Sequence, residues 1–169
     1  MEQCAECGFV YDPADVPRTS RRTREFAAEI SGILSRGGDG ADLLSRRSPE
    51  VWSPLEYGCH MRDVLLVQRE RVLSALRVPR FECVPMGRDE RVEHDGYAEQ
   101  EPADVARQLT DAAAMFGRVL DRLDRLDAGA WDREVLYPYP DPTPRTLGWV
   151  ALHTAHEAQH HLGDIRRQL

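Results

Sequence analysis

Apolar residues recur three and four positions apart in four long stretches of this chain, and this periodicity constrains the fold more than any other feature. A stripe with that period lies along one face of an α-helix, so each stretch predicts an amphipathic helix. No convincing alternation of apolar and polar residues predicts a β-strand. We therefore expect an all-α fold, a four-helix bundle. The helices are expected to begin near Thr19 or Ser20, Pro54, Pro102 and Thr146.

The clearest helix start lies at Ser53. A serine cap, Pro54 at the first helical position and Glu56 three residues after the serine form a capping box. This second helix is expected to run to about Pro79. The third is expected to carry its inward stripe as far as Leu126.

The connections between the predicted helices are too long for simple hairpins. They cover roughly residues 37–52, 79–101 and 128–145. Connections of this length permit crossovers between helices and lids over a pocket. We expect the second and third of them to roof a pocket at one end of the bundle, although ordinary surface loops fit the same composition.

Length and charge limit the function classes. A chain of 169 residues can form one domain with a real core, and its net charge of −7 argues against a nucleic-acid partner, which needs a concentrated basic surface. No apolar signal core or membrane-length stretch is present, so we expect no membrane partner and a cytoplasmic protein. We divide the chain into an N-terminal segment, residues 1–17, and a bundle, residues 18–169.

Two cysteines near the N-terminus, Cys4 and Cys7, precede Gly8 in the pattern Cys-x-x-Cys-Gly. This pattern is half of a zinc knuckle, because the tight turn aims two thiolates at one ion and glycine tolerates a left-handed backbone. The sequence holds no second Cys-x-x-Cys. Cys59, Cys83 or a histidine can complete the site in space. A redox pair and an inert turn remain alternatives.

Four of the six histidines and a glutamate gather in the last predicted helix: His153, His156, Glu157, His160 and His161. Residues four apart share a helix face and can bind one divalent cation. At about 100° per residue, Glu157 and His161 flank the apolar stripe, whereas His153, His156 and His160 lie toward the wet side. The pair Glu157 and His161 is therefore favoured. His156 and His160 form an alternative register, which fits the metalloprotease pattern His-Glu-x-x-His. An exposed histidine-rich face with no metal is the simplest alternative.

A third ligand is expected from the second helix, where His60 flanks the apolar stripe in a similar way. Two helices with ligands on the flanks of their buried faces can meet on one ion in a bundle interior. Asp63 or Asp164 is expected to orient one of the imidazoles.

The chain resembles the DinB superfamily of four-helix metal proteins over residues 18–169. The resemblance rests on two runs, Trp-x-x-x-Glu-x-x-x-His-x-x-Asp from Trp52 to Asp63 and Glu-x-x-x-His-x-x-Asp-Ile from Glu157 to Ile165. It implies a zinc or other divalent ion held by one histidine of the second helix and two ligands of the last. In this chain these are His60, Glu157 and His161. A related sulfoxide synthase domain carries His-Glu-x-x-His, which keeps the other register open.

The superfamily includes bacillithiol- and mycothiol-dependent transferases and a mycothiol-dependent maleylpyruvate isomerase, and glutamate at position 157 resembles the isomerase branch. The resemblance implies a metal-dependent thiol S-transferase or isomerase. Its partners would be a low-molecular-weight thiol, such as mycothiol, and an electrophile. Arg62, Arg145 and Tyr137 are candidates to bind the thiol's polar body. The alternatives are a non-catalytic, stress-related metal-binding bundle that forms a homodimer, and a zinc hydrolase.

Overall fold

The start of the second long helix shows how the sequence positions the site. In the computed structural model, the Ser53 hydroxyl accepts a hydrogen bond from the Glu56 N–H at 3.2 Å, and the Glu56 carboxylate accepts one from the Ser53 N–H at 2.7 Å. Arg46 holds the same carboxylate at 2.6 Å. The predicted capping box is thus confirmed. It fixes the beginning of the helix that presents His60 one turn later.

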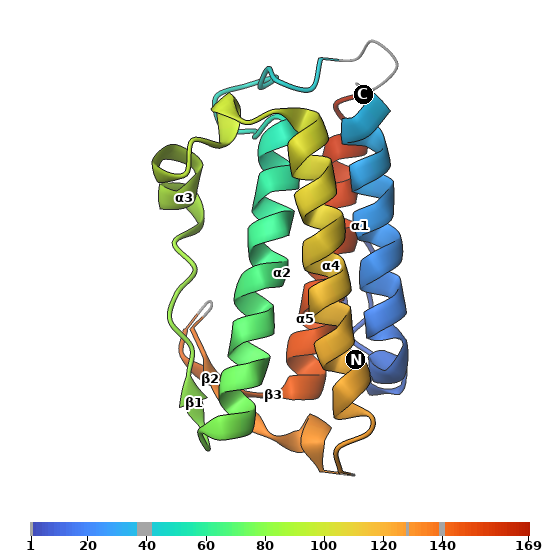
Figure 1. Ribbon diagram of the computed structural model, residues 1–169, viewed down its shortest axis with the longest axis vertical. Helices are drawn as coiled ribbons and strands as arrows, with labels where there is room; N and C mark the ends of the chain where they lie inside the picture. The colour runs from blue at the N-terminus through green and yellow to red at the C-terminus, as the bar shows by residue number, and fades with distance from the viewer. Residues whose placement is uncertain (1, 37–41, 128, 139–140) are drawn as a thin grey trace.

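The structure describes residues 2–36, 42–127, 129–138 and 141–169, and four long helices dominate it (Figure 1). Thr146 caps the last of them by accepting a hydrogen bond from the Trp149 N–H. The helices are α1 (Thr19–Arg36), α2 (Pro54–Arg77), α4 (Pro102–Leu123) and α5 (Leu147–Arg166). All four were predicted.

The helices pack so that α4 and α5 each contact both α1 and α2. In Figure 1, α2 and α4 run in the same direction and α1 and α5 in the opposite one. The chain between α2 and α4 must therefore return along the side of the bundle. It does so through the short helix α3 (Arg88–His94) and the 3₁₀ turn η3 (Tyr97–Glu99). This crossover confirms the four-helix bundle with long connections.

A small three-stranded sheet corrects the all-α prediction. It consists of β1 (Phe81–Glu82), β2 (Glu134–Tyr137) and β3 (Thr143–Thr146). β2 pairs with β1 in parallel and with β3 antiparallel. Strands of two to four residues are too short to show a period of two, so the sequence pattern did not indicate them.

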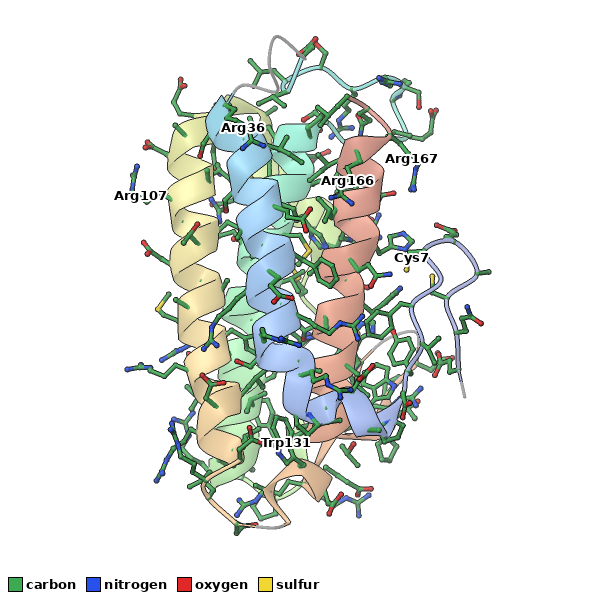
Figure 2. All side chains as sticks on the ribbon, turned by 90° about the vertical axis from the view of Figure 1, so that its right-hand side faces the viewer. Cys7, Arg36, Arg107, Trp131, Arg166 and Arg167 are labelled. Carbon is green, nitrogen blue, oxygen red and sulfur yellow. The ribbon has the colours of Figure 1, made fainter. Side chains whose placement is uncertain are left out.

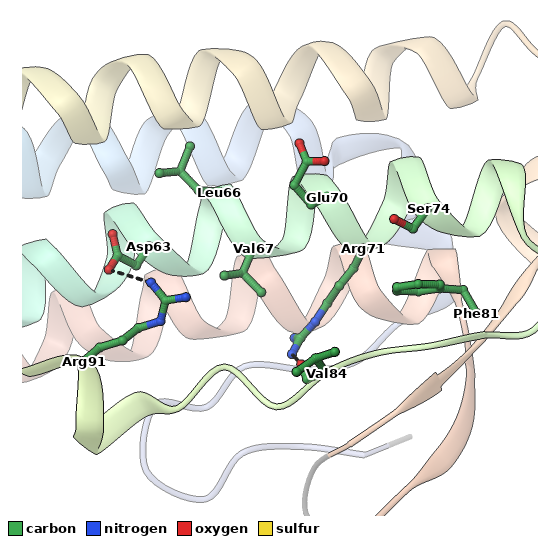
Figure 3. A pocket seen from close by; sticks show the side chains of 9 residues that line it. All are labelled: Asp63, Leu66, Val67, Glu70, Arg71, Ser74, Phe81, Val84 and Arg91. Atoms are coloured by element: carbon green, nitrogen blue, oxygen red, sulfur yellow. Dashed lines mark hydrogen bonds and ion pairs between the residues drawn. The ribbon is translucent and has the colours of Figure 1, made fainter. Parts of the chain in front are cut away.

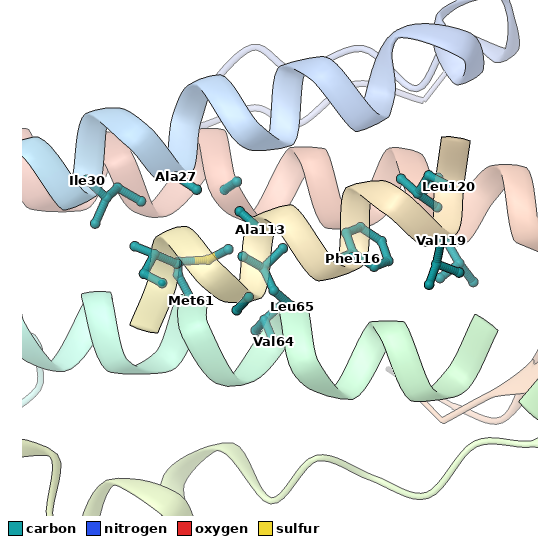
Figure 4. Packing of buried hydrophobic residues seen from close by; sticks show 14 of the residues in the cluster. Ala27, Ile30, Met61, Val64, Leu65, Ala113, Phe116, Val119 and Leu120 are labelled. Carbon is teal, nitrogen blue, oxygen red and sulfur yellow. The ribbon is translucent and has the colours of Figure 1, made fainter. Parts of the chain in front are cut away.

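The core lies between the four helices (Figure 4). Leu65 of α2 and Phe116 of α4 are fully buried there, beside Ile30 of α1. Truncating one such leucine to alanine typically costs about 2–5 kcal/mol. Leu126, which was predicted to face inward, is exposed because α4 ends at Leu123. No helix among the described residues combines the length and apolar character that crossing a membrane requires.

The N-terminal segment, residues 2–17, runs beside α5 (Figure 2). Phe9 is 2% exposed and packs against Leu152 and Ala155 of that helix. The segment ends in the 3₁₀ turn η1 (Pro13–Arg18), which leads directly into α1. One face of α5 is therefore covered by the beginning of the chain.

Candidate metal centre

His60 of α2 meets Glu157 and His161 of α5 in the bundle interior. Each residue offers one ligand atom, and these atoms lie within 4.8 Å of one another. The Nε2 atom of His161 is 3.5 Å from a carboxylate oxygen of Glu157. Ligands on a tetrahedral zinc ion, at about 2.0–2.2 Å from the metal, lie about 3.4 Å apart. The three side chains are thus close enough for one ion to lie between them.

His60 is a buried, neutral imidazole in this arrangement. Its side chain is buried, and its Nδ1 atom has no hydrogen-bond partner among the described residues. Trp52 packs against the ring at 5.0 Å between centroids. Burial, with some help from the charge of His161, lowers the pKa of His60 to about 3. A bound cation would satisfy a buried ring nitrogen of this kind.

Asp164 orients His161. The His161 Nδ1 atom lies 2.7 Å from an Asp164 oxygen, which turns Nε2 toward Glu157. Burial lowers the pKa of His161, but hydrogen bonds with Asp164 and Glu157 raise it above its ordinary value overall. A carboxylate on the far nitrogen of a metal-binding histidine is the usual arrangement in metalloproteins.

Glu157 is ionised in this site. Burial raises its pKa, but the hydrogen bonds with His156 and His161 outweigh burial and hold it below the ordinary range. Two imidazoles, which are borderline ligands, and a carboxylate, which is a hard one, form a set that binds zinc and other divalent transition metals. The residues therefore fit the metal that the sequence pattern implies.

A cavity of about 540 Å³ opens beside this cluster, between α2 and α5. His60, Glu157 and His153 line it, and the chain at 85–89 and Tyr137–Pro138 close it from outside. The two long connections thus roof a pocket, as predicted. The pocket lies along the middle of α2, from His60 to Arg71, and not at one end of the bundle.

Two cavity residues were missed in the sequence. Gln68 and Arg71 are buried, and both donate hydrogen bonds to the Tyr137 hydroxyl, at 2.9 and 3.1 Å. They stand eight and eleven residues after His60, which places them on the same face of α2. The sequence could have indicated them, because Gln68 and Arg71 are polar residues that follow His60 along the same helix face.

A second cavity, of about 340 Å³, lies on the neighbouring face of α2 (Figure 3). Asp63 lines it and bonds to Arg62, Arg91 and Tyr97. None of these contacts involves His60. Of the two aspartates expected to orient an imidazole, the structure brings only Asp164 to the cluster.

The three residues expected to bind a thiol cofactor occupy different places. Tyr137 lines the larger cavity. Arg62 is buried elsewhere against Asp63, Asp95 and two glutamines, and Arg145 stacks on the Trp149 ring at 4.4 Å. The structure does not bring either arginine to the cavity beside His60.

The alternative register, His156 and His160, gathers with Cys4 and Cys7 and not with His60. These histidines and His153 were expected on a wet face. That expectation is wrong, because the N-terminal segment covers all three, and the side chains of His153, His156 and His160 are 15%, 14% and 20% exposed. The Tyr11 hydroxyl lies 3.0 Å from Nδ1 of His153 and 2.9 Å from Nδ1 of His156.

This chain is similar to a known protein family in sequence and to a solved structure in fold. The family model of the DinB superfamily matches residues 18–165. This chain belongs to the DinB superfamily. Among solved structures it is similar to YfiT from Bacillus subtilis, described as a probable metal-dependent hydrolase with an unusual four-helix bundle topology. The TM-score is 0.69 at 16% identity, covering 88% of this chain and 85% of YfiT. At that identity the likeness concerns the fold. No curated protein matches the sequence.

Proposed function

We propose that this protein is a metal-dependent thiol S-transferase or isomerase, in which a low-molecular-weight thiol such as mycothiol reacts with an electrophile in the larger cavity. The observation that carries the proposal is the position of His60 and Glu157 in the wall of that cavity, with His161 beside them. Three protein ligands leave a coordination position open to a small molecule. A bound divalent ion would lower the pKa of a thiol and hold it as the reactive thiolate.

The chain's own residues suit a polar cofactor. The Arg71 guanidinium is fixed by Tyr137, Gln68 and the Val84 carbonyl, so it offers a positioned positive charge in the cavity wall. Arg88, exposed at the rim, lies over the Trp52 ring at 4.6 Å. Ordered donors of this kind recognise the hydroxyl, amide and carboxylate groups of a thiol's polar body.

The nucleophile is external. No cysteine lines the cavity among the described residues. Burial raises the pKa of the Cys59 thiol to about 12, and that thiol is within hydrogen-bonding distance of the Tyr97 carbonyl. Cys83 is buried as well, and burial raises its pKa. Neither side chain supplies a thiolate to a substrate beside His60.

The two reactions share their first step. In transfer, the thiol loses its proton, a sulfur–carbon bond forms, and the leaving group departs with the electron pair of its bond to carbon. In isomerisation, the thiolate adds to a conjugated double bond, the resulting carbon–carbon single bond rotates, and elimination of the thiolate re-forms the double bond in the other geometry. Both require a thiolate held against an electrophile in a site that excludes competing water.

The test is a conjugation assay with monobromobimane and an isomerisation assay with maleylpyruvate, each using mycothiol, bacillithiol, glutathione or no thiol. We expect turnover that needs both a divalent metal and one of these thiols, and that is lost in His60→Ala. His94→Ala, which removes an exposed histidine of α3 outside every cluster, is the matched control. Metal-dependent turnover of ester or amide substrates without any thiol would favour hydrolysis, the activity ascribed to YfiT. No turnover with any thiol would favour a non-catalytic bundle.

A further inference from the structure

The Cys-x-x-Cys-Gly turn is folded as a knuckle. The Cys4 N–H donates to the Phe9 carbonyl at 2.9 Å, and the Gly8 N–H donates to the Cys4 carbonyl at 3.0 Å. Gly8 has φ = +71°, a left-handed conformation that a side chain would disfavour. This backbone places both thiols on the side of the turn that faces α5, where Cys7 lies between the segment and the helix in Figure 2.

Two histidines of α5 complete the group. Each of Cys4, Cys7, His156 and His160 offers one ligand atom, and the four atoms lie within 4.8 Å of one another. The Cys4 Sγ atom is 3.8 Å from Nδ1 of His160. On tetrahedral zinc, a sulfur at about 2.3 Å and a nitrogen at about 2.0–2.1 Å lie about 3.6 Å apart. His156 and His160 are four residues apart, so both point from one face of α5.

We propose that Cys4, Cys7, His156 and His160 form a second metal site, a closed Cys₂His₂ zinc site that fastens the N-terminal segment to α5. This site shares no ligand with the cluster around His60, although His156 Nδ1 lies 3.5 Å from a Glu157 oxygen, and its four protein ligands leave no position for a substrate. Its function is structural. His156 and His160 fit the metalloprotease pattern His-Glu-x-x-His but do not line the larger cavity, and in this site they bind the structural ion instead.

The ring nitrogens of His156 and His160 are arranged as this zinc site requires. Nδ1 of His156 faces the Tyr11 hydroxyl, while its Nε2 is buried with no hydrogen-bond partner among the described residues. Nε2 of His160 lies 3.3 Å from a Glu6 carboxylate oxygen, which leaves Nδ1 for the ion. Each imidazole thus has one nitrogen held by an oriented polar group and the other toward the thiols, as zinc-binding histidines usually do.

Both cysteines are free thiols. The rest of the segment holds the turn in place. Gln159 donates to the Cys7 carbonyl at 3.1 Å, and Arg22 lies over the Phe9 ring at 5.1 Å.

Metal content of the purified, reduced protein tests the proposal. We expect two zinc ions per chain. Cys4→Ser/Cys7→Ser and His160→Ala should each reduce this to one, and so should His60→Ala, which leaves the knuckle intact. His94→Ala should keep both ions. A wild-type protein that binds one ion, lost in His60→Ala and kept in the double serine variant, would overturn the second site while leaving the proposed function standing.

Cobalt substitution separates the two sites by the chemistry of their ligands. Thiolate ligands give bound Co²⁺ an intense near-ultraviolet charge-transfer band that nitrogen and oxygen ligands do not give. We expect this band in wild type and in His60→Ala, and its loss in Cys4→Ser/Cys7→Ser. An unchanged band in His160→Ala and in His156→Ala would show that the thiols bind metal without these histidines. Circular dichroism of each variant confirms that the helices persist, so that lost metal reports lost ligands.

Discussion

Two clusters of candidate metal ligands draw on the same six residues of α5, from His156 to His161. His156 and His160 point toward the N-terminal segment, whereas Glu157 and His161, one residue later, point toward α2. A step of one residue rotates a ligand by about 100° around the helix. The thiol-containing cluster brings together four candidate ligands, and the cluster of His60, Glu157 and His161 brings together three and adjoins a cavity. Residues four apart on one helix can supply two ligands to a metal ion. The segment packed against that helix determines whether the site gains one further ligand, as from α2, or two, as from the N-terminal segment.

The largest effect is expected on catalysis, from changes in the cluster of His60, Glu157 and His161. His60→Ala should reduce thiol conjugation on the order of 10³-fold, because losing the ion removes several kcal/mol of transition-state stabilisation. The fold should survive, since the remaining core is unchanged. Steady-state kinetics together with thermal unfolding of the variant measure both effects. Conjugation that persists at the wild-type rate would show that the chemistry does not use this cluster.

Loss of the site formed by Cys4, Cys7, His156 and His160 should lower the stability of the fold and not the catalytic rate. Cys4→Ser/Cys7→Ser should lower the free energy of unfolding by about 4 kcal/mol at a free zinc concentration 1,000 times the dissociation constant. Turnover per ion at the open site should change little. Urea unfolding at fixed zinc, compared with the same experiment in chelator, provides the measurement. If chelator lowers the free energy of unfolding of wild type and of the serine variant by the same amount, Cys4 and Cys7 do not bind a stabilising zinc ion.

A smaller effect should follow from Asp164→Asn. This aspartate holds His161 at 2.7 Å but is 3.8 Å from Nε2 of His160. Metal affinity should therefore fall about 10–100-fold at the open site and much less at the closed one. Competition with a chromophoric chelator, in wild type and in the double serine variant, resolves the two sites. A larger loss at the thiol site would reverse our assignment of Asp164.

The smallest effect should come from Asp121→Asn, on the far side of the bundle. Burial raises the Asp121 pKa, but Arg24 and Ser20 hold it below its ordinary value. The ionised group therefore stabilises the fold above the unfolded-state pKa, and this contribution is lost as pH falls through the lower folded-state pKa. Both ion-pair side chains are about two-fifths exposed (39% and 41%), so about 1 kcal/mol or less is expected. Urea unfolding at pH 7 and pH 3 measures it, and metal analysis should still find both ions.

Local signals predicted much of this molecule. The capping box at Ser53 gave the start of α2, and the helical wheel gave Glu157 and His161 their inward direction. Both depend on residues within two turns of one another. The wheel could not show that His153 and His156 are covered, because the covering residue, Tyr11, lies about 140 positions away in sequence. Arg62 was misplaced for a related reason: its partner Asp95 belongs to the crossover, whose path the sequence pattern did not specify.

The contact between Cys4 and His160 spans 156 positions, and this separation has a consequence for how the protein is made. A ribosome adds about 5–20 residues per second, so the first cysteines wait roughly 8–30 s before their histidine partners are synthesised. During that interval the two thiols are unprotected and open to oxidation or to capture by another metal. Synthesis of α5 therefore supplies the histidine partners that the proposed zinc site requires, and it ends the exposure of these two thiols.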